Sequence, residues 1–311
     1  MPNPRLKLFQ LLICLIALAG VSADLMGQEL QPRRWATLPS GINFIGAGTA
    51  WTYGDINFDP ALLIEDAEMD LVGLVGSYVR TFGMFGRQAR IDVALPFANG
   101  SWRGLLDGEP ASVRRQGFGD AQLRFSYNFL GAPELSMGEF RQHMAENPVS
   151  TTAGFGLSVT VPTGEYRNDQ LINLGANRWV IRPEIGVLHQ RNKWQFEVTG
   201  SVFIFGDNDD FWMGTEREQD PLWFAQGHAI YTFKPGLWAS FSGGYAWGGR
   251  SEISGVRKGD DSRLRYWKIT VGVPINARQG LSFAFATGRS NTLFDSDLDR
   301  VVVAWSLMFG N

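Results

Sequence analysis

The residues best suited to chemistry in this 311-residue sequence are charged side chains that alternate with apolar ones. Arg182 and Glu184 share one parity of a segment in which Ile181 and Ile185 occupy the other parity. Such alternation gives a β-strand one polar face and one apolar face. The same pattern singles out eight polar-face positions: Arg90, Asp92, Asp120, Arg124, Arg182, Glu184, Glu197 and His228. Both signs of charge are present, so these groups either form a stabilising ion-pair network or line the path of a solute.

Three charged residues of this set are expected to lie close together. A tight turn at 190–192 would place Glu197 beside Glu184 and diagonal to Arg182 in an antiparallel pair. Two carboxylates and one guanidinium would give this wall a local excess of negative charge. We therefore expect Glu184→Gln to leave assembly near normal and to alter ion selectivity or solute uptake. Val198 has the opposite parity, so Val198→Arg should impair assembly.

The histidines do not form a predicted catalytic arrangement. His143, His189 and His228 fall in three segments that we do not expect to converge. An outer-membrane phospholipase would carry a His-x-Ser-Asn-Gly type of motif, and here Ser290-Asn291 has no adjacent histidine. Nucleophilic catalysis requires the nucleophile beside its base, so we expect no enzymatic activity and no cofactor.

Acidic residues near the C-terminus raise the question of a calcium site. Asp295, Asp297 and Asp299 alternate, but Arg300 stands where the calcium loop of an EF-hand needs glycine. We expect no metal site in the protein interior. The acidic residues are interpreted as a solvated surface loop that divalent ions could bridge to lipopolysaccharide.

Period-two alternation continues through most of the sequence. It is clearest at 118–130, where Leu123 and Phe125 alternate with Arg124 and Ser126. We predict twelve strands, at residues 42–53, 70–82, 87–98, 118–130, 152–162, 178–189, 193–205, 222–233, 237–248, 264–275, 281–288 and 300–309. Most are close to the roughly 9–11 residues that a tilted membrane strand requires. Two all-β folds fit: a soluble sandwich with an apolar core, or a transmembrane antiparallel up-and-down β-barrel whose apolar face meets lipid.

The connections between the strands favour the barrel. Tight turns are predicted at 83–86, 190–192, 234–236 and 276–280. Long polar loops are predicted at 54–69, 99–117, 163–177, 206–221, 249–263 and 289–299. Bacterial outer-membrane barrels alternate short periplasmic turns with longer extracellular loops in this way. The segment 131–151 is an exception, because it should be a short periplasmic turn; its polar stretch FRQHMAEN is interpreted as a short helical excursion.

Aromatic residues also favour the barrel. Trp179, Trp223, Trp247 and Trp267 fall at the predicted outer strand ends, and Tyr127, Trp194 and Phe309 fall at the inner ends. Amphipathic rings prefer the two membrane interfaces. The last strand ends in an apolar stripe that finishes at Phe309, which looks like the terminal signal read by the outer-membrane assembly machinery.

The N-terminus resembles a secretory signal. Arg5 and Lys7 precede an apolar run at 8–21, and Val21-Ser22-Ala23 is a suitable cleavage site. A membrane anchor is the alternative, but this run is shorter than the roughly 20 residues of a spanning helix. We expect residues 1–23 to be a removed signal peptide, 24–41 an irregular periplasmic N-terminal lead-in, and 42–311 the barrel.

Removal of that signal would define the charge and redox chemistry of the mature chain. Cys14 is the single cysteine of the sequence, so the mature protein would have no disulfide or thiolate site. Loss of Arg5 and Lys7 would change the formal net charge from −3 to −5. A mild acidic balance argues against nucleic acid as a partner. We expect the Gram-negative outer membrane as the location, with the lipid bilayer, lipopolysaccharide and the assembly machinery as partners.

Three stretches of this sequence resemble a known family. They are PRRWATLPSGINFIGAGTAWTYGDINFDP (32–60), PTGEYRNDQLINLGANRWVIRPEIGV (162–187) and DPLWFAQGHAIYTFKPGLWASFSGGYAWGG (220–249). They are similar to the outer-membrane family of the MetA pathway of phenol degradation, and the likeness covers most of the mature chain. The resemblance implies a barrel that helps aromatic hydrocarbons cross the outer membrane, and it assigns no binding residues.

Function follows less directly than fold. A channel or transporter for small hydrophobic or aromatic compounds could use an aromatic entrance in the outer loops, for which Tyr166, Phe211 and Trp212 are the candidates. The alternatives are a narrow general or ion-selective porin and a closed structural barrel. Barrels of eight strands are filled by side chains and barrels of sixteen leave an aqueous channel, so the lumen of a twelve-stranded barrel is shaped by its own residues.

Overall fold

The structure is a computed structural model that describes residues 30–56, 64–170, 172–212, 214–290 and 296–310. The predicted signal peptide, residues 1–23, lies outside the described residues, as do residues 24–29 of the predicted lead-in. Asp295 of the acidic loop also lies outside them.

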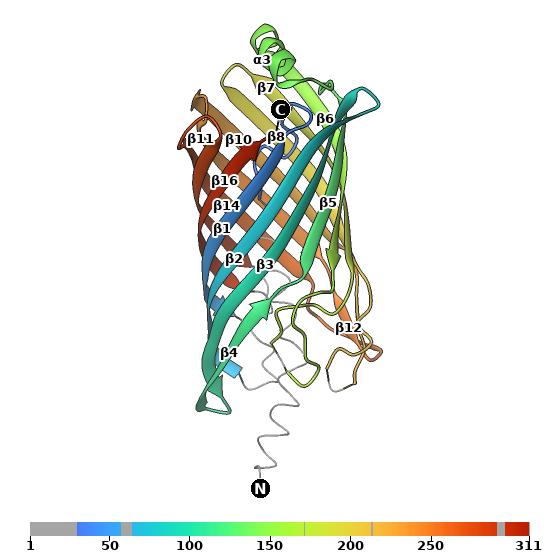
Figure 1. The fold of residues 1–311 in the computed structure, drawn as a ribbon. Coiled ribbons are helices and arrows are strands. Elements are labelled where there is room, and N and C mark those ends of the chain that lie inside the picture. The colour runs from blue at the N-terminus through green and yellow to red at the C-terminus, as the bar shows by residue number, and fades with distance from the viewer. Residues whose placement is uncertain (1–29, 57–63, 171, 213, 291–295, 311) are drawn as a thin grey trace.

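Twelve antiparallel strands in the described part of the chain close into a barrel (Figure 1). Each strand pairs with its neighbour along the chain, and β1 also pairs with β16, which closes the sheet. The predicted transmembrane up-and-down barrel is therefore confirmed. The strands are β1 (Asn43–Ile56), β2 (Ile64–Met84), β3 (Arg87–Leu106), β5 (Ala121–Leu130), β6 (Val149–Val161), β7 (Val180–Arg191), β8 (Trp194–Phe205), β10 (Leu222–Lys234), β11 (Leu237–Gly248), β14 (Ser262–Pro274), β15 (Gln279–Ser290) and β16 (Asp297–Phe309).

The predicted loop at 99–117 is wrong, because the strands continue through it. β3 extends to Leu106 and pairs with β4 (Glu109–Phe118), forming a hairpin beyond the barrel wall. Asp107 and Gly108 form its turn with left-handed backbones, at φ 50° and 76°. Asp-Gly is a preferred sequence for such a two-residue turn. β4 and β5 are separated at residues 119–120, so the predicted strand 118–130 is divided there.

The two ends of the barrel differ (Figure 1). At one end lie the C-terminus and α3 (Met137–Glu146), which confirms the short helical excursion. Ser136 and Glu139 form a reciprocal capping box at the start of α3. The other end carries the β3–β4 hairpin and a small sheet of β9 (Arg217–Gln219), β12 (Ser251–Ile253) and β13 (Val256–Arg257). By the rule of short periplasmic turns, the end with α3 is periplasmic and the other is the outer end.

The outer face of the barrel is apolar and its interior is polar. Val198 is 65% exposed and Ile185 is 60% exposed, whereas Arg182, Glu184 and Glu197 are at most 5% exposed. This is the reverse of a soluble sandwich and matches a barrel whose outward face contacts lipid. The four tryptophans predicted at the outer strand ends, Trp179, Trp223, Trp247 and Trp267, are 40–53% exposed on this face.

Among the described residues, no helix combines the length and the apolar character that crossing a membrane would need.

The segment 30–42 runs through the barrel interior. Leu30 is fully buried against Leu222, Phe224 and Leu264, close to the outer ends of their strands. Near the periplasmic end, the Gly41 amide donates to the Thr81 carbonyl at 2.9 Å. The segment is irregular, as expected for the lead-in, but it lies within the lumen instead of outside the barrel. Buried polar groups on the strands supply the partners that its backbone needs, as shown next.

Candidate functional site

Trp35 anchors the segment 30–42 to the wall of the lumen. Gly154 on β6 and Gly186 on β7 stand opposite each other in the sheet, and both face this ring. A Cβ atom on Gly186 would lie 2.0 Å from Trp35 Nε1, so a larger residue there would exclude the indole. Trp35 Nε1 donates to Thr199 Oγ1 at 2.8 Å. The two glycines therefore create a niche that fixes the segment in the lumen.

Two glutamates of the barrel wall bind the same segment. Glu197 accepts hydrogen bonds from the backbone amides of Arg34 and Trp35, at 3.2 and 3.3 Å. Glu184 accepts from Arg34 Nε at 3.2 Å. Both carboxylates are buried, so these hydrogen bonds compensate for the loss of water around them. The inward glutamates thus have a definite role in holding the lumen segment.

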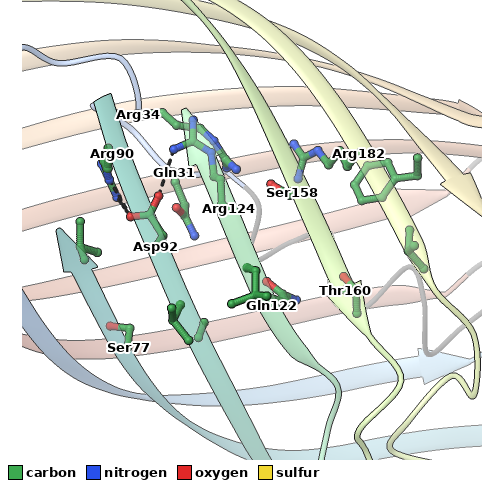
Figure 2. Close-up of a pocket in the computed structure, with 16 residues that line it drawn as sticks. Gln31, Arg34, Ser77, Arg90, Asp92, Gln122, Arg124, Ser158, Thr160 and Arg182 are labelled. Carbon is green, nitrogen blue, oxygen red and sulfur yellow. Dashed lines mark hydrogen bonds and ion pairs between the residues drawn. The ribbon is translucent and has the colours of Figure 1, made fainter. Parts of the chain in front are cut away.

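A row of ion pairs connects this anchor to the neighbouring strands, and Figure 2 shows the part formed by Arg90, Asp92 and Arg124. Arg124 on β5 donates to Glu184 through Nε, and its Nη1 lies 3.1 Å from Asp92 Oδ2. Asp92 also accepts from Arg90 Nε at 2.6 Å. On β7, Arg182 Nε donates to Ser201 Oγ at 3.1 Å, and its Nη2 lies 4.0 Å from Glu184. The predicted inward residues of β3, β5 and β7 therefore share one network.

The expected excess of negative charge on this wall is not found. The hairpin turns at Asn192 and Lys193, with Asn192 left-handed at φ 55°, so Glu184 pairs with Ser201 and Glu197 pairs with Leu188. The prediction placed the turn at 190–192, whereas residues 192–193 form it, and the predicted register between the two strands was wrong. The inward face was nevertheless predicted correctly, since Arg182, Glu184 and Glu197 are buried and Val198 is exposed. Arg34 and Arg124, from other elements, then supply positive charge to Glu184.

His228 and Asp120 lie outside this network. His228 Nδ1 is 2.7 Å from Ser242 Oγ, and its Nε2 is 4.0 Å from Glu197 Oε1. Asp120 accepts from the backbone amides of Gly164 and Ala176, both at 2.8 Å. Asp120 therefore fixes an outer loop to the barrel rim, and its contact with a solute stays a prediction.

Of the three aromatic residues predicted at the loop entrance, Tyr166 is hydrogen-bonded to Phe211, and both Phe211 and Trp212 are buried. Tyr166 donates a hydrogen bond to the carbonyl of Phe211, and Asn208 Nδ2 donates to Tyr166 Oη at 3.1 Å. Phe211 and Trp212 are 1% and 5% exposed. Arg217 lies over the Phe211 ring at 5.5 Å, and burial lowers the pKa of this guanidinium to about 10. These side chains join two outer loops, and their contact with a solute stays a prediction.

Two cavities lie along the segment 30–42. The first, which we call the lumen cavity, has a volume of about 210 Å³. It is bounded by Gln31 and Arg34 of the segment and by Arg90, Asp92 and Arg124 of the wall (Figure 2). A second cavity of about 850 Å³ opens at the periplasmic end, between α3 and the barrel mouth. We call it the periplasmic vestibule; its mainly apolar wall includes Leu38, Phe44, Phe140, Met144 and Phe233.

Sequence reasoning did not identify two residues that organise this site. Arg34 and Trp35 lie in the segment that was expected outside the barrel, and both are buried within it. The paired glycines of β6 and β7 were a possible signal, since a glycine on an inward face indicates that something approaches the strand closely. The glycines did not indicate which part of the chain would approach the strands.

The three histidines of the described residues lie on separate elements. His143 is on α3, His189 on β7 and His228 on β10, and each contacts a different neighbour. Within the described ranges, no cluster of three or more histidine, cysteine, aspartate or glutamate side chains could hold a metal ion.

The sequence and the fold both match those of known proteins. The family model described as "Putative MetA-pathway of phenol degradation" matches residues 65–292. The solved COG4313 outer membrane channel from Pseudomonas putida F1 is similar in fold, with a TM-score of 0.73 and 20% sequence identity; the match covers 90% of this chain and 99% of that one.

A second solved structure matches with a lower score. The translocator domain of the autotransporter NalP from Neisseria meningitidis has a TM-score of 0.47 and 10% identity, over 93% of this chain and 96% of that domain. No curated protein matches the sequence.

Proposed function

Because this chain belongs to the MetA-pathway of phenol degradation family of outer-membrane barrels, we propose that it carries small hydrophobic or aromatic compounds across the outer membrane. The family and the barrel fold support a channel of the outer membrane. The choice of hydrophobic solutes is our inference, suggested by the family description and supported by the interior of this chain.

The periplasmic vestibule is the observation that carries the proposal. Its volume of about 850 Å³ lies within the roughly 300–1,000 Å³ typical of small-molecule sites. Phe44, Phe140, Met144 and Phe233 contribute to its wall. An aqueous porin needs a polar, water-filled lumen, whereas this interior is narrowed by the segment 30–42 and leads to an apolar chamber.

A closed structural barrel is the second candidate, and the anchoring of the lumen segment favours it. Trp35, Arg34 and the glutamates of the wall hold the segment through several buried hydrogen bonds. If these contacts persist at all times, the barrel would pass no solute. The third alternative, a general or ion-selective porin, would require a steady ion current through the same lumen.

Uptake by cells separates the three possibilities. Cells with an intact lipopolysaccharide layer would express the full chain, and the initial uptake of toluene would be compared with that of arabinose. We expect the protein to accelerate toluene uptake while arabinose uptake stays at the level of cells without it. Faster arabinose uptake would favour the porin, and no acceleration of either solute would favour the closed barrel.

A further inference from the structure

We propose that the lumen cavity and the periplasmic vestibule together form a binding site for an amphipathic anion, with a carboxylate at the arginines and an apolar body in the vestibule. This inference rests on the proposed function and specifies its substrate class. It is argued from the charges, the shape and the unsatisfied polar group of the two cavities.

Positive charge dominates the surface of the lumen cavity. Among its described lining residues are the four arginines Arg34, Arg90, Arg124 and Arg182, whereas Asp92 is the one acidic residue in that lining. Glu184 touches three of these arginines but does not line the cavity. Glu184 therefore pairs with Arg34, Arg124 and Arg182 from outside the cavity, while Asp92 pairs with Arg90 and Arg124 within its wall. A second carboxylate in the cavity would meet an unbalanced positive surface.

Arg124 has one nitrogen that remains without an acceptor. Its Nε donates to Glu184, and its Nη1 donates to Asp92 and to Ser126. Its Nη2 is buried and has no hydrogen-bond partner. An unsatisfied buried donor on a charged group is costly, and arginine binds carboxylates in a two-pronged geometry. Arg124 lines the lumen cavity, and a ligand carboxylate there would supply the missing acceptor once a small rotation of the side chain exposes this enclosed nitrogen.

The periplasmic vestibule combines an apolar wall with cations. Arg33, Arg90, Lys193 and Lys234 belong to its described lining, which contains no aspartate or glutamate. On α3, Phe140 and Met144 are four residues apart and therefore share one helix face; both are half-buried and contribute to the same wall. An apolar chamber with positive charge of this kind suits the body of an anionic solute better than that of a cationic one.

The two cavities adjoin, which makes one ligand possible. Val79 and Arg90 belong to the lining of both. Arg90 donates to Asp92 at 2.6 Å, with its side chain 21% exposed, so it stands at the junction without being enclosed. A solute of the length of an aryl alkanoate can place its carboxylate beside Arg90 and Arg124 while its ring contacts the vestibule wall.

Binding of a matched set of three solutes tests the proposal. The full chain in lipid nanodiscs would be dialysed against 4-phenylbutyrate, 4-phenylbutanol or 4-phenylbutylammonium, with empty nanodiscs to subtract partitioning into lipid. These probes differ mainly in the charge of the head group. We expect the carboxylate to bind at least about tenfold more tightly than the alcohol, and the ammonium to bind least, because a charged acceptor strengthens the hydrogen bonds. Added salt should reduce the preference.

Substitutions locate the binding. Arg90→Gln leaves Asp92 paired with Arg124, so the barrel should fold, and the preference for the carboxylate should fall about tenfold. Phe140→Ser on α3 should weaken binding of all three probes, because it removes apolar wall without changing charge. Arg114→Gln is the matched control: this exposed arginine of β4 lies at the outer end and should change nothing.

The outcomes separate this inference from the proposed function. If the alcohol binds as tightly as the carboxylate, or if Arg90→Gln leaves the preference intact, the anion site is wrong, while uptake of neutral aromatics can stand. If the carboxylate binds as expected but cells show no accelerated toluene uptake, the site is supported and neutral hydrocarbons are not its cargo. Binding of the ammonium in preference to the carboxylate would overturn the inference outright.

Discussion

At the scale of single residues, Glu184 holds three parts of the molecule together. It receives Arg34 from the lumen segment and Arg124 from β5, while Arg182 of its own strand approaches to 4.0 Å. Sequence alternation correctly predicted that Glu184 and Arg182 face inward. It could not predict Arg34, because that contact joins residues far apart in the chain and depends on where an irregular segment lies.

Glu184→Gln should destabilise the barrel, contrary to the expectation from sequence. The substitution removes the carboxylate that Arg34 and Arg182 approach and one of the two carboxylates of Arg124, and breaking a buried pair typically costs about 3–5 kcal/mol. Unfolding by urea in vesicles, followed by the gel mobility of the folded barrel, should show a lower midpoint. Glu109→Gln, at the exposed start of β4, is the control and should match the unmodified protein. An unchanged midpoint for Glu184→Gln would mean that the network contributes little to stability.

Gly186→Val should release the lumen segment. A side chain at this position would occupy the niche of the Trp35 indole, since even a Cβ atom would lie 2.0 Å from its nitrogen. Overpacking costs about 1–3 kcal/mol, and displacement of the segment should raise single-channel conductance. Gly200→Val is the matched control, because a Cβ there meets no atom within 4 Å. Equal conductance in both variants would show that the segment does not limit the current.

At the scale of elements, strand identity was predictable and strand length was not. Alternation located the twelve wall strands because each has a lipid face and a lumen face. Alternation missed the hairpin of β3 and β4 beyond the wall. Neither face of that hairpin contacts lipid, so its apolar and polar residues alternate less regularly. The register between β7 and β8 was also missed, because it depends on the backbone of Asn192, whose left-handed conformation sets a two-residue turn.

Val198→Arg tests the outward face of β8. Val198 is 65% exposed and points away from the lumen, so an arginine there would face hydrocarbon. Near the bilayer midplane such a substitution costs about 2–4 kcal/mol. The yield of folded barrel in membranes should fall. Val256→Arg on β13 is the control, since Val256 is 58% exposed but lies in the small sheet at the outer end. Equal yields for both would mean that the two faces of β8 are assigned the wrong way.

At the scale of the whole molecule, the alternation of short and long connections predicts the orientation. α3 and the C-terminus lie at one end, and the β3–β4 hairpin lies at the other (Figure 1). The sequence predicted this asymmetry even where it misjudged individual loops, because alternation of connection length does not depend on their internal structure. The path of the segment 30–42 could not be predicted from the sequence, because the periodicity of the strands does not indicate what fills the lumen.

Cysteine labelling tests the orientation, and removal of Cys14 with the predicted signal would leave no background thiol. Glu109→Cys on the outer hairpin should react with an impermeant thiol reagent on intact cells. Gln142→Cys, on an exposed position of α3, should react after the outer membrane is breached and not before. The reverse pattern would invert the barrel, and equal labelling of both positions on intact cells would argue against insertion.

The course of the segment 30–42 also constrains the order in which the protein assembles. The barrel closes where β1 meets β16, the first and last wall strands, and such distant pairings form slowly. The niche for Trp35 is built on β6, β7 and β8, which are consecutive and can pair while the barrel is still open. If the segment docks there early, the sheet can close around it. If it docks late, it must enter a barrel that has already closed. Trp35→Ala should therefore slow closure during refolding into vesicles, and an unchanged refolding rate would favour late threading.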